Sequence, residues 1–300
     1  MRAEILADSI SPEGQRLTTF KVRFHRFVLA EFNTHRVFSR NSASSRAIPL
    51  EKQLKKMDEG PSYPISWPVE QAGMQGGSEL QGDDLKLAQE LVQRVCANTI
   101  DDIYGYMGEL QLKYGDDAKS HRLHKSVINR LIEPFMEHEA IVTATELQNF
   151  FDQRCSPLAQ PEIRVAAEDM RTAFLESTPR ELEYGAWHTP LLRPEDDLWI
   201  IQFAIKTGLT PSYIAAAISV ARCARVSYLT HEGVRDPLKD IELFNNLVSA
   251  SPPHWSPLEH VATPARPGTN LLGNLAGWEQ LRHTTTWELT PINTGEQTNG

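Results

Sequence analysis

The chain has 300 residues, of which 40% are hydrophobic and 23% are charged, and its formal net charge at pH 7 is −9. These values are typical of globular domains and argue against a disordered, collagen-like or coiled-coil chain. The longest apolar stretch, 213–221, is about half as long as a bilayer crossing, and the acidic N-terminal segment lacks a signal-sequence core. Three widely spaced cysteines cannot form a complete disulfide framework. We therefore expect a soluble cytoplasmic protein with no membrane partner.

Positive charge is concentrated in residues 16–46. This segment holds seven cationic side chains and one acid, Glu31, a local net charge of +6 in an acidic chain. The acidic total disfavours binding to a nucleic-acid polymer, which needs many cations to neutralise phosphates. We expect a small anionic ligand at this segment. The alternative is a solvated basic face that pairs with acidic surface elsewhere.

In the first part of the chain, alternation of apolar and polar residues predicts a half-buried strand over 18–24. Residues 26–35 then predict a short helix, and 37–46 a loop rich in hydrogen-bonding side chains. Residues 58–84 hold clustered Pro and Gly without a period, which predicts a long mobile loop or lid.

The rest of the chain is predicted to be mainly helical. Apolar residues at helical spacing predict helices over 85–103 (Leu87, Leu91, Val95), 130–153 (Ala144, Leu147, Phe151), 160–176 (Ile163, Ala167, Met170, Phe174) and from Thr210-Pro211 onward (Ile214, Ala217, Ile218, Ala221). The proline-rich segment 250–300 is predicted to be irregular. Because no linker divides the chain cleanly, we expect a single domain over 1–300.

Several familiar chemistries lack their motifs. No GxGxxG follows a strand and no GxxxxGK[ST] occurs, so neither a classical dinucleotide fold nor a P-loop is indicated. His121 and His124 lack the spacing of zinc ligands, and the acidic runs 101–102 and 195–197 lack that of calcium ligands, so we expect no metal.

The cysteines offer one candidate nucleophile. Cys155 follows Arg154, whose charge would lower the pKa of the thiol. Cys96 and Cys223 lie on apolar stretches and are predicted to be packing residues.

The most informative stretch is 34–46, THRVFSRNSASSR, which combines three guanidiniums, an imidazole and several hydroxyls. Such groups bind phosphate bidentately and donate to uncharged oxygens. The stretch resembles the signature of the flavin-dependent thymidylate synthases, in which Arg-His-Arg is followed after seven residues by Ser and, two further on, by Arg. The matching positions are His35, Arg36, Asn41, Ser44 and Arg46, whereas Thr34 replaces the first Arg and Ser42 replaces an acid.

Other regions extend this resemblance over about half of the chain. Residues 129–134, 143–154 and 159–163 are similar to the family's later helices. Residues 225–227 and 254–260 (HWSPLEH) resemble a segment that lies near the N-terminus in the family but comes last here. This order implies a circular permutation. Residues 52–120 and 177–215 are not placed, and a weak echo of 31–36 at 278–283 is ascribed to chance.

The resemblance implies an α+β fold, mostly helical with a small, largely antiparallel sheet, and a homotetramer with active sites at subunit interfaces. It also implies that FAD, reduced by NADPH, carries a one-carbon unit from methylenetetrahydrofolate to C5 of dUMP. Carried over by position, the substrate residues are Glu31, Ser44, Ser45, Arg46, Arg130 and Arg154, of which Arg154 is also catalytic; the flavin residues are His35, Arg36, Ser39, Asn41, Asn149, Ser227 and His260.

Each assignment has a plain structural alternative. Arg36 and Arg46 would pair with surface acids, His260 would cap a turn, Asn149 would satisfy a helix backbone, and Arg154 would complement a helix dipole. Thr34 and Leu158 depart from the family pattern and imply weaker or altered flavin binding. Hydroxymethylation, action on dCMP, and a non-catalytic nucleotide-binding module therefore stay open as alternatives.

Overall fold

The computed structural model describes residues 2–226, 236–271, 273–283 and 291–293. Its main sheet has the strand order β3-β4-β2-β1-β5. The strands are β1 (Arg2–Ile10), β2 (Arg16–His25), β3 (Ser39–Ser42), β4 (Glu137–Ala144) and β5 (Arg180–Glu181). Neighbours are antiparallel except β1 and β5, which are parallel. The predicted α+β class is confirmed, with a sheet that is mixed but largely antiparallel.

The helices are distributed over the rest of the described chain, between loops. They are α1 (Leu29–Phe32), α2 (Leu50–Glu59), α3 (Gly82–Tyr114), α4 (Lys125–Ile128), α5 (Gln148–Arg154), α6 (Pro161–Glu176), α7 (Asp197–Thr207), α8 (Pro211–Arg225) and α9 (Pro237–Ser249). Short 3-10 helices are η1 (Arg26–Val28), η2 (Gly115–His121), η3 (Asn129–Leu131), η4 (Glu133–Phe135), η5 (Pro194–Asp196), η7 (Ser256–His260) and η8 (Leu281–His283). A two-stranded sheet pairs β6 (Ala262–Pro264) with β7 (Trp278–Gln280).

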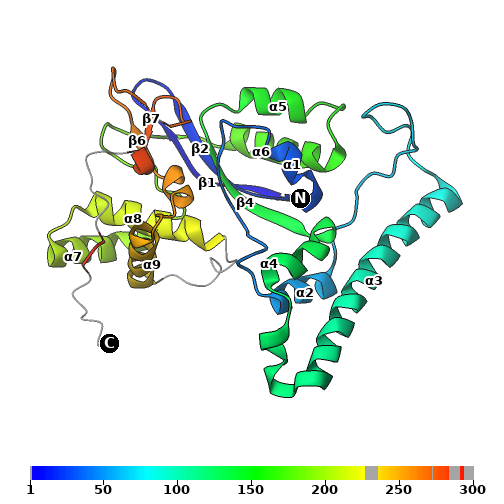
Figure 1. Ribbon diagram of the computed structural model, residues 1–300. Coiled ribbons are helices and arrows are strands. Elements are labelled where there is room, and N and C mark those ends of the chain that lie inside the picture. Colours follow the sequence, from blue (N-terminus) through cyan, green and yellow to red (C-terminus); the bar gives the residue numbers. More distant parts are fainter. Residues whose placement is uncertain (1, 227–235, 272, 284–290, 294–300) are drawn as a thin grey trace.

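One face of the sheet is covered by α5 and α6 (Figure 1). Phe20, Val22 and Phe24 alternate along β2 and pack with Phe150 of α5 and Ile163 of α6 in one buried cluster. The predicted strand over 18–24 and the helix over 160–176 are therefore confirmed, with small differences in their ends.

The predicted helix over 130–153 is wrong. Residues 137–144 form β4, which lies between β2 and β3 at the centre of the sheet, and α5 begins only at Gln148. A strand with both faces covered has no polar alternation, so periodicity does not distinguish it from a buried helix. The predicted loop over 37–46 also contains a strand, β3, which pairs with the edge of β4.

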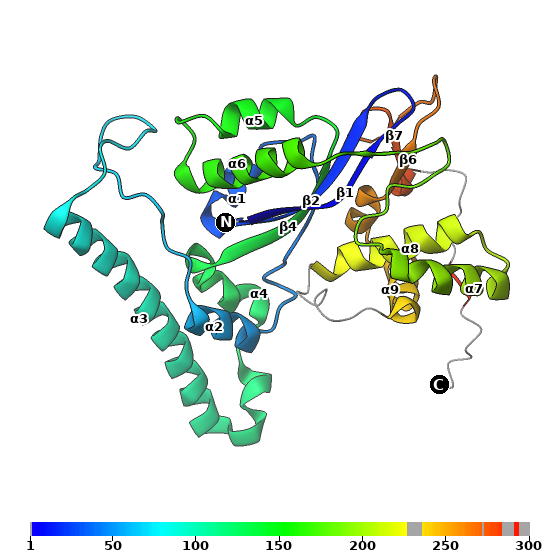
Figure 2. The same cartoon turned by 180° about the vertical axis from the view of Figure 1, so that it is seen from behind.

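The helix α3 extends away from the body of the molecule (Figures 1 and 2). It continues eleven residues past the predicted end at Ile103. The side chains of Leu87, Leu91 and Val95 are 65%, 50% and 47% exposed, whereas Cys96 and Ile103 are buried. The predicted apolar stripe thus faces outward in this chain. Residues 60–81 before it are largely loop, as predicted, and their mobility stays a prediction.

A second helical layer consists of α7, α8 and α9 (Figure 2). The hydroxyl of Thr210 caps α8 by accepting from the backbone N–H of Tyr213 at 3.4 Å. The predicted stripe that starts with Ile214 and ends with Ala221 is fully buried in this layer. Both the start signal and the buried face of this helix are confirmed.

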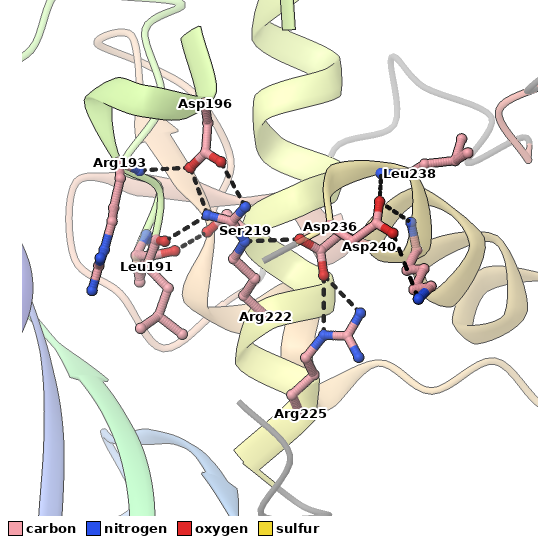
Figure 3. A network of polar contacts seen from close by, with 11 residues as sticks. Leu191, Arg193, Asp196, Ser219, Arg222, Arg225, Asp236, Leu238 and Asp240 are labelled. Atoms are coloured by element: carbon pink, nitrogen blue, oxygen red, sulfur yellow. Dashed lines mark hydrogen bonds and ion pairs between the residues drawn. The ribbon is translucent and has the colours of Figure 1, made fainter. Parts of the chain in front are cut away.

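Arg222 joins the helices of this layer through buried ion pairs (Figure 3). Its NH1 and NH2 groups donate to Asp196 at 2.6 and 2.7 Å, and its Nε donates to Asp240 at 2.8 Å. Asp240 also accepts from Arg225 at 2.8 and 3.0 Å. Because a buried charge without its partner costs about 3–5 kcal/mol, this network fixes the end of α8 against α9.

Hydrogen bonds between side chains connect the C-terminal segment to the sheet. Thr19 and Thr143 lie opposite each other on β2 and β4, and their hydroxyls are 2.7 Å apart. His188 Nε2 is 2.8 Å from Thr19 Oγ1, and His260 Nδ1 is 2.8 Å from Thr143 Oγ1. All four side chains are fully buried. The segment 250–300 is therefore more regular than predicted, since η7, β6 and β7 dock here.

The proposed permutation requires residue 17 to lie near residue 260. Leu17 and Ala262 belong to one buried cluster, so this requirement is met. The permutation itself, and a single domain over 1–300, stay predictions. Within the described ranges, no helix is long and apolar enough to cross a membrane.

The buried imidazoles predict a dependence of stability on pH. Burial lowers the pKa of His188 and of His260 from 6.5 to about 3, so below pH 6.5 the unfolded chain binds protons that the folded chain does not. The free energy of unfolding should therefore fall as the pH decreases from 7 to 5. Urea denaturation at each pH measures it.

The control for this experiment compares two histidines. His188→Gln should make the slope shallower, whereas exchange of the exposed His254 for Gln should leave it unchanged. A free energy of unfolding that is constant from pH 7 to 5 in the unmodified chain would contradict this account of the buried imidazoles.

Candidate functional site

Arg154, at the end of α5, meets the turn that follows α1. Its Nε donates to His35 Nε2 at 2.8 Å. Its NH2 group donates to Thr34 Oγ1 at 3.0 Å and to the backbone carbonyl of Glu31 at 3.3 Å. The structure thus brings together Glu31, His35 and Arg154, three residues predicted to belong to the site, and Thr34, which replaces the first Arg of the motif.

The environment of His35 fixes its protonation. Its ring is 8% exposed and lies edge-on to Phe150, with centroids 4.8 Å apart. Burial, and then the charges of Arg154 and Arg40, lower the pKa of His35 to about 4. Because Arg154 donates to Nε2, the single proton of the neutral ring is on Nδ1. At neutral pH the ring therefore accepts from Arg154 and keeps a donor on its other nitrogen.

Glu31 adds an unsatisfied acceptor to this cluster. Its Oε2 is buried and has no hydrogen-bond partner among the described residues. A buried acceptor without a partner lowers the free energy of unfolding, so we expect a ligand or a water molecule to donate a hydrogen bond to it.

A groove of about 470 Å³ lies beside Arg36. It is lined by Arg36, Phe38, Glu259, Gly273, Asn274, Gln280, Arg282 and His283. Arg36 is exposed, and Asn274 holds the loop by donating to the carbonyl of Val37 at 2.8 Å. Sequence reasoning did not find Asn274 and Gln280, and the weak echo at 278–283 was the one signal near them. They reach the motif only through the tertiary fold.

A second cluster holds the predicted phosphate residues. The amide of Asn129 donates to the backbone carbonyls of Ser45 and Ile48 at 2.7 and 3.0 Å, so the loop that carries Ser44 and Arg46 packs against the segment that carries Arg130. The side chains of Arg46 and Arg130 are exposed, Ser44 is half-buried and Ser45 is buried. Among the described residues of one chain, no hydrogen bond or ion pair joins this cluster to Arg154.

Three predicted flavin residues have hydrogen-bond partners within the protein. Ser39 accepts from Gln280 at 2.9 Å, Asn41 donates to the carbonyl of Cys223 at 2.6 Å, and His260 contacts Thr143. All three side chains are buried. Asn149 is exposed on the first turn of α5, and Ser227 lies outside the described residues. Flavin contacts for these five residues stay predictions.

The expectation that Arg154 lowers the pKa of Cys155 is wrong. Burial raises the pKa of this thiol, and the Arg154 guanidinium points to His35. Cys96 and Cys223 are buried, as predicted for packing residues. The part of the chain that the structure describes contains no group of three or more His, Cys, Asp or Glu that could hold a metal ion.

The Arg154–His35 contact predicts a titration shift. Arg154→Gln removes a positive charge next to the ring, so the pKa of His35 should rise from about 4 toward 6.5 without reaching it, because burial is the larger cause. NMR titration of the histidine resonances measures the shift. Arg94→Gln, on the exposed face of α3, should leave the titration unchanged. An unchanged or lower pKa in the Arg154 variant would contradict the contact.

Two solved structures are similar in part. The flavin-dependent thymidylate synthase ThyX from Helicobacter pylori, complexed with FAD and dUMP, is 19% identical, with a TM-score of 0.32 over 53% of this chain and 67% of that chain. The UMP/dUMP methylase PolB from Streptomyces cacaoi, bound with 5-Br UMP, is 16% identical, with a TM-score of 0.41 over 58% of this chain and 88% of that chain. Among curated proteins, no sequence matches.

A family model also matches the sequence. It is the model of the Thymidylate synthase complementing protein family, and it covers residues 11–180, more than half of the chain. The matched range contains the motif at 34–46 and the helix that ends at Arg154. The chain therefore belongs to the Thymidylate synthase complementing protein family and is a flavin-dependent thymidylate synthase-like methyltransferase.

Proposed function

We propose that this protein transfers a one-carbon unit from methylenetetrahydrofolate to C5 of dUMP, forming dTMP, in a reaction that depends on FAD. The observation that carries the proposal is the Arg154 cluster. Its Nε and NH2 groups are held by His35 and Thr34, whereas NH1 has no hydrogen-bond partner among the described residues. A fixed guanidinium with a free NH1 group suits a carbonyl oxygen of the pyrimidine.

The role of Arg154 follows from the chemistry at C5. When C5 of the base becomes nucleophilic, negative charge builds on the ring oxygens. A preoriented cation stabilises that charge at no cost of reorganisation. Burial keeps the pKa of His35 at about 4, so the ring is neutral at pH 7. It therefore accepts a hydrogen bond from Arg154 and holds it in place without neutralising its positive charge.

The cysteines support a flavin route over attack by an enzyme thiol. Cys96 and Cys223 are buried, and burial raises the pKa of Cys155. A thiol needs a lowered pKa to act as a nucleophile at neutral pH. All three cysteines are free, which is also why a reducing cytoplasm stays the proposed location.

The groove beside Arg36 fits part of a flavin nucleotide. Arg36 supplies an exposed cationic donor for a diphosphate, Arg282 pairs with Glu259 in the same lining, and Asn274 and Gln280 contribute amide groups. When bound, FAD supplies the redox chemistry of the transfer, with NADPH as the proposed reductant. Thr34 contributes a hydroxyl where the family motif has a cation, so we propose weaker flavin binding than that motif provides.

The nucleotide phosphate is assigned to Ser44, Arg46 and Arg130, whose loops Asn129 holds together. Since these residues and Arg154 form two clusters in one chain, we propose that a second copy completes the site in a homo-oligomer, with a tetramer as the expected state. The outward stripe of Leu87, Leu91 and Val95 on α3 supports self-association, because an apolar stripe on a projecting helix pairs with its own copy across a two-fold axis.

The first test concerns the reaction. The purified protein should bind FAD, a nicotinamide donor should bleach the flavin, and tritium should be released from 5-tritiated dUMP only when the folate is present. Arg154→Gln should lower the rate about 10²–10³-fold, as loss of an oxyanion donor does. Lys239→Gln, which removes an exposed cation from α9, serves as the control.

Two outcomes would contradict the proposal. A protein that gains no flavin absorbance with FAD does not use it. If dUMP then raises the melting temperature and Arg46→Ala abolishes that rise, the chain is a non-catalytic nucleotide-binding module.

The second test concerns assembly. Leu91→Glu places a charge in the apolar stripe, so light scattering after size exclusion should give a lower mass for the assembly. Leu112→Glu changes a leucine farther along the same helix, 91% exposed against 50% for Leu91, and should leave the mass unchanged. A monomeric unmodified chain, or equal masses for both variants, would refute this role of α3.

A further inference from the structure

A separate cavity of about 410 Å³ lies under α2. Its walls come from α2, the end of β2, the start of β4 and the loop that carries Ser45. Ser45 is the one predicted site residue that lines it, and Arg154, Arg46 and Arg130 are all absent from its walls. A cavity of this size is in the range of small-molecule sites.

The lining residues carry buried donors without partners. Arg26 NH1 donates to His138 Nδ1 at 2.7 Å, and burial together with the Arg26 charge lowers the pKa of His138 to about 3. The neutral ring therefore carries its proton on Nε2. That nitrogen, and Arg26 Nε, are buried and have no hydrogen-bond partner among the described residues.

Gln53 adds both a donor and an acceptor. Its side chain is 1% exposed, and neither Nε2 nor Oε1 of its amide has a partner within the described ranges. Each buried polar group without a partner costs about 1–3 kcal/mol. Together with Arg26 and His138, the cavity lining has three unsatisfied donor atoms against two unsatisfied acceptors among the described residues, Gln53 Oε1 and Glu139 Oε1. This surplus of donors favours a ligand rich in oxygen acceptors.

The net charge of the lining also favours an anionic ligand. Arg23, Arg26, Lys52 and Lys56 line the cavity against Glu59, Glu137 and Glu139, which leaves a net charge of +1. Arg26 is paired with Glu133, which is outside the cavity lining, at 2.9 Å. Lys56 forms no ion pair in the described part of the chain. Met57, Ile48 and Met136 supply apolar surface for an organic body.

We propose that this cavity binds a small organic oxyanion, a phosphate ester or a carboxylate, at a site separate from the Arg154 cluster. The oxyanion takes hydrogen bonds from the unsatisfied donors and neutralises the surplus cation. The amide oxygen of Gln53 accepts a hydrogen bond, so the cavity favours an oxyanion that also carries a donor group over one that does not. The inference does not depend on the proposed methyl transfer.

Calorimetric titration of the full chain with inorganic phosphate, and separately with succinate, tests the site and distinguishes phosphate from carboxylate. We expect one of the two to bind with one site per chain. Lys56→Ala should weaken that binding about tenfold or more, because it removes a charge-assisted contact. Lys55→Ala is the matched control, since Lys55 is the adjacent exposed lysine, pairs with Glu59 and does not line the cavity.

Two further variants make the outcome decisive. Arg46→Ala should leave the affinity unchanged, because Arg46 does not line the cavity, which separates this site from the proposed nucleotide phosphate site. Gln53→Leu should weaken binding while the free energy of unfolding without ligand stays equal or rises, because an unsatisfied amide has been removed. Absence of binding by both anions, equal affinities for the Lys55 and Lys56 variants, loss of binding in the Arg46 variant, or tight binding retained by the Gln53 variant would each overturn the proposal.

Discussion

The hydroxyls of Thr19 and Thr143 join parts of the chain that are far apart in the sequence. Each threonine lies at the centre of the sheet and contacts one buried histidine from the second half of the chain, His188 or His260. Both imidazoles are neutral at physiological pH, because burial lowers the pKa of each ring to about 3. Because η7 and the strands after it dock through them, the groove beside Arg36 depends on this pair of hydroxyls.

The concentration of positive charge in residues 16–46 has two different uses. Arg16 pairs with Asp8 at 2.6 Å, Arg23 with Glu139 at 3.1 Å and Arg26 with Glu133 at 2.9 Å. These cations stabilise the ends of β2 and its neighbours. Arg36 and Arg46 are exposed and have no hydrogen-bond partner or ion pair in the described part of the chain, so they are the cations left for a ligand.

The sequence predicted those parts of the fold that are encoded locally. The alternation in β2, the stripe of α6, and the cap and buried face of α8 each lie within one segment. β4 was missed because a central strand buried on both faces has no period. The family resemblance of residues 34–46 and 143–154 placed His35 and Arg154 in one predicted site, and the two side chains are hydrogen-bonded. Asn274, Gln280 and the cavity under α2 were missed because only tertiary packing assembles them.

The central claim is that this arrangement directs a one-carbon unit to C5 of a deoxyuridine nucleotide. Mass spectrometry of the nucleotides tests it most directly, after turnover with FAD, a nicotinamide donor and methylenetetrahydrofolate, when dUMP and dCMP are offered together. We predict a product heavier than dUMP by one CH₂ group, with dCMP unchanged. A product that also carries an oxygen, a product formed from dCMP, or no new nucleotide at all would contradict the claim.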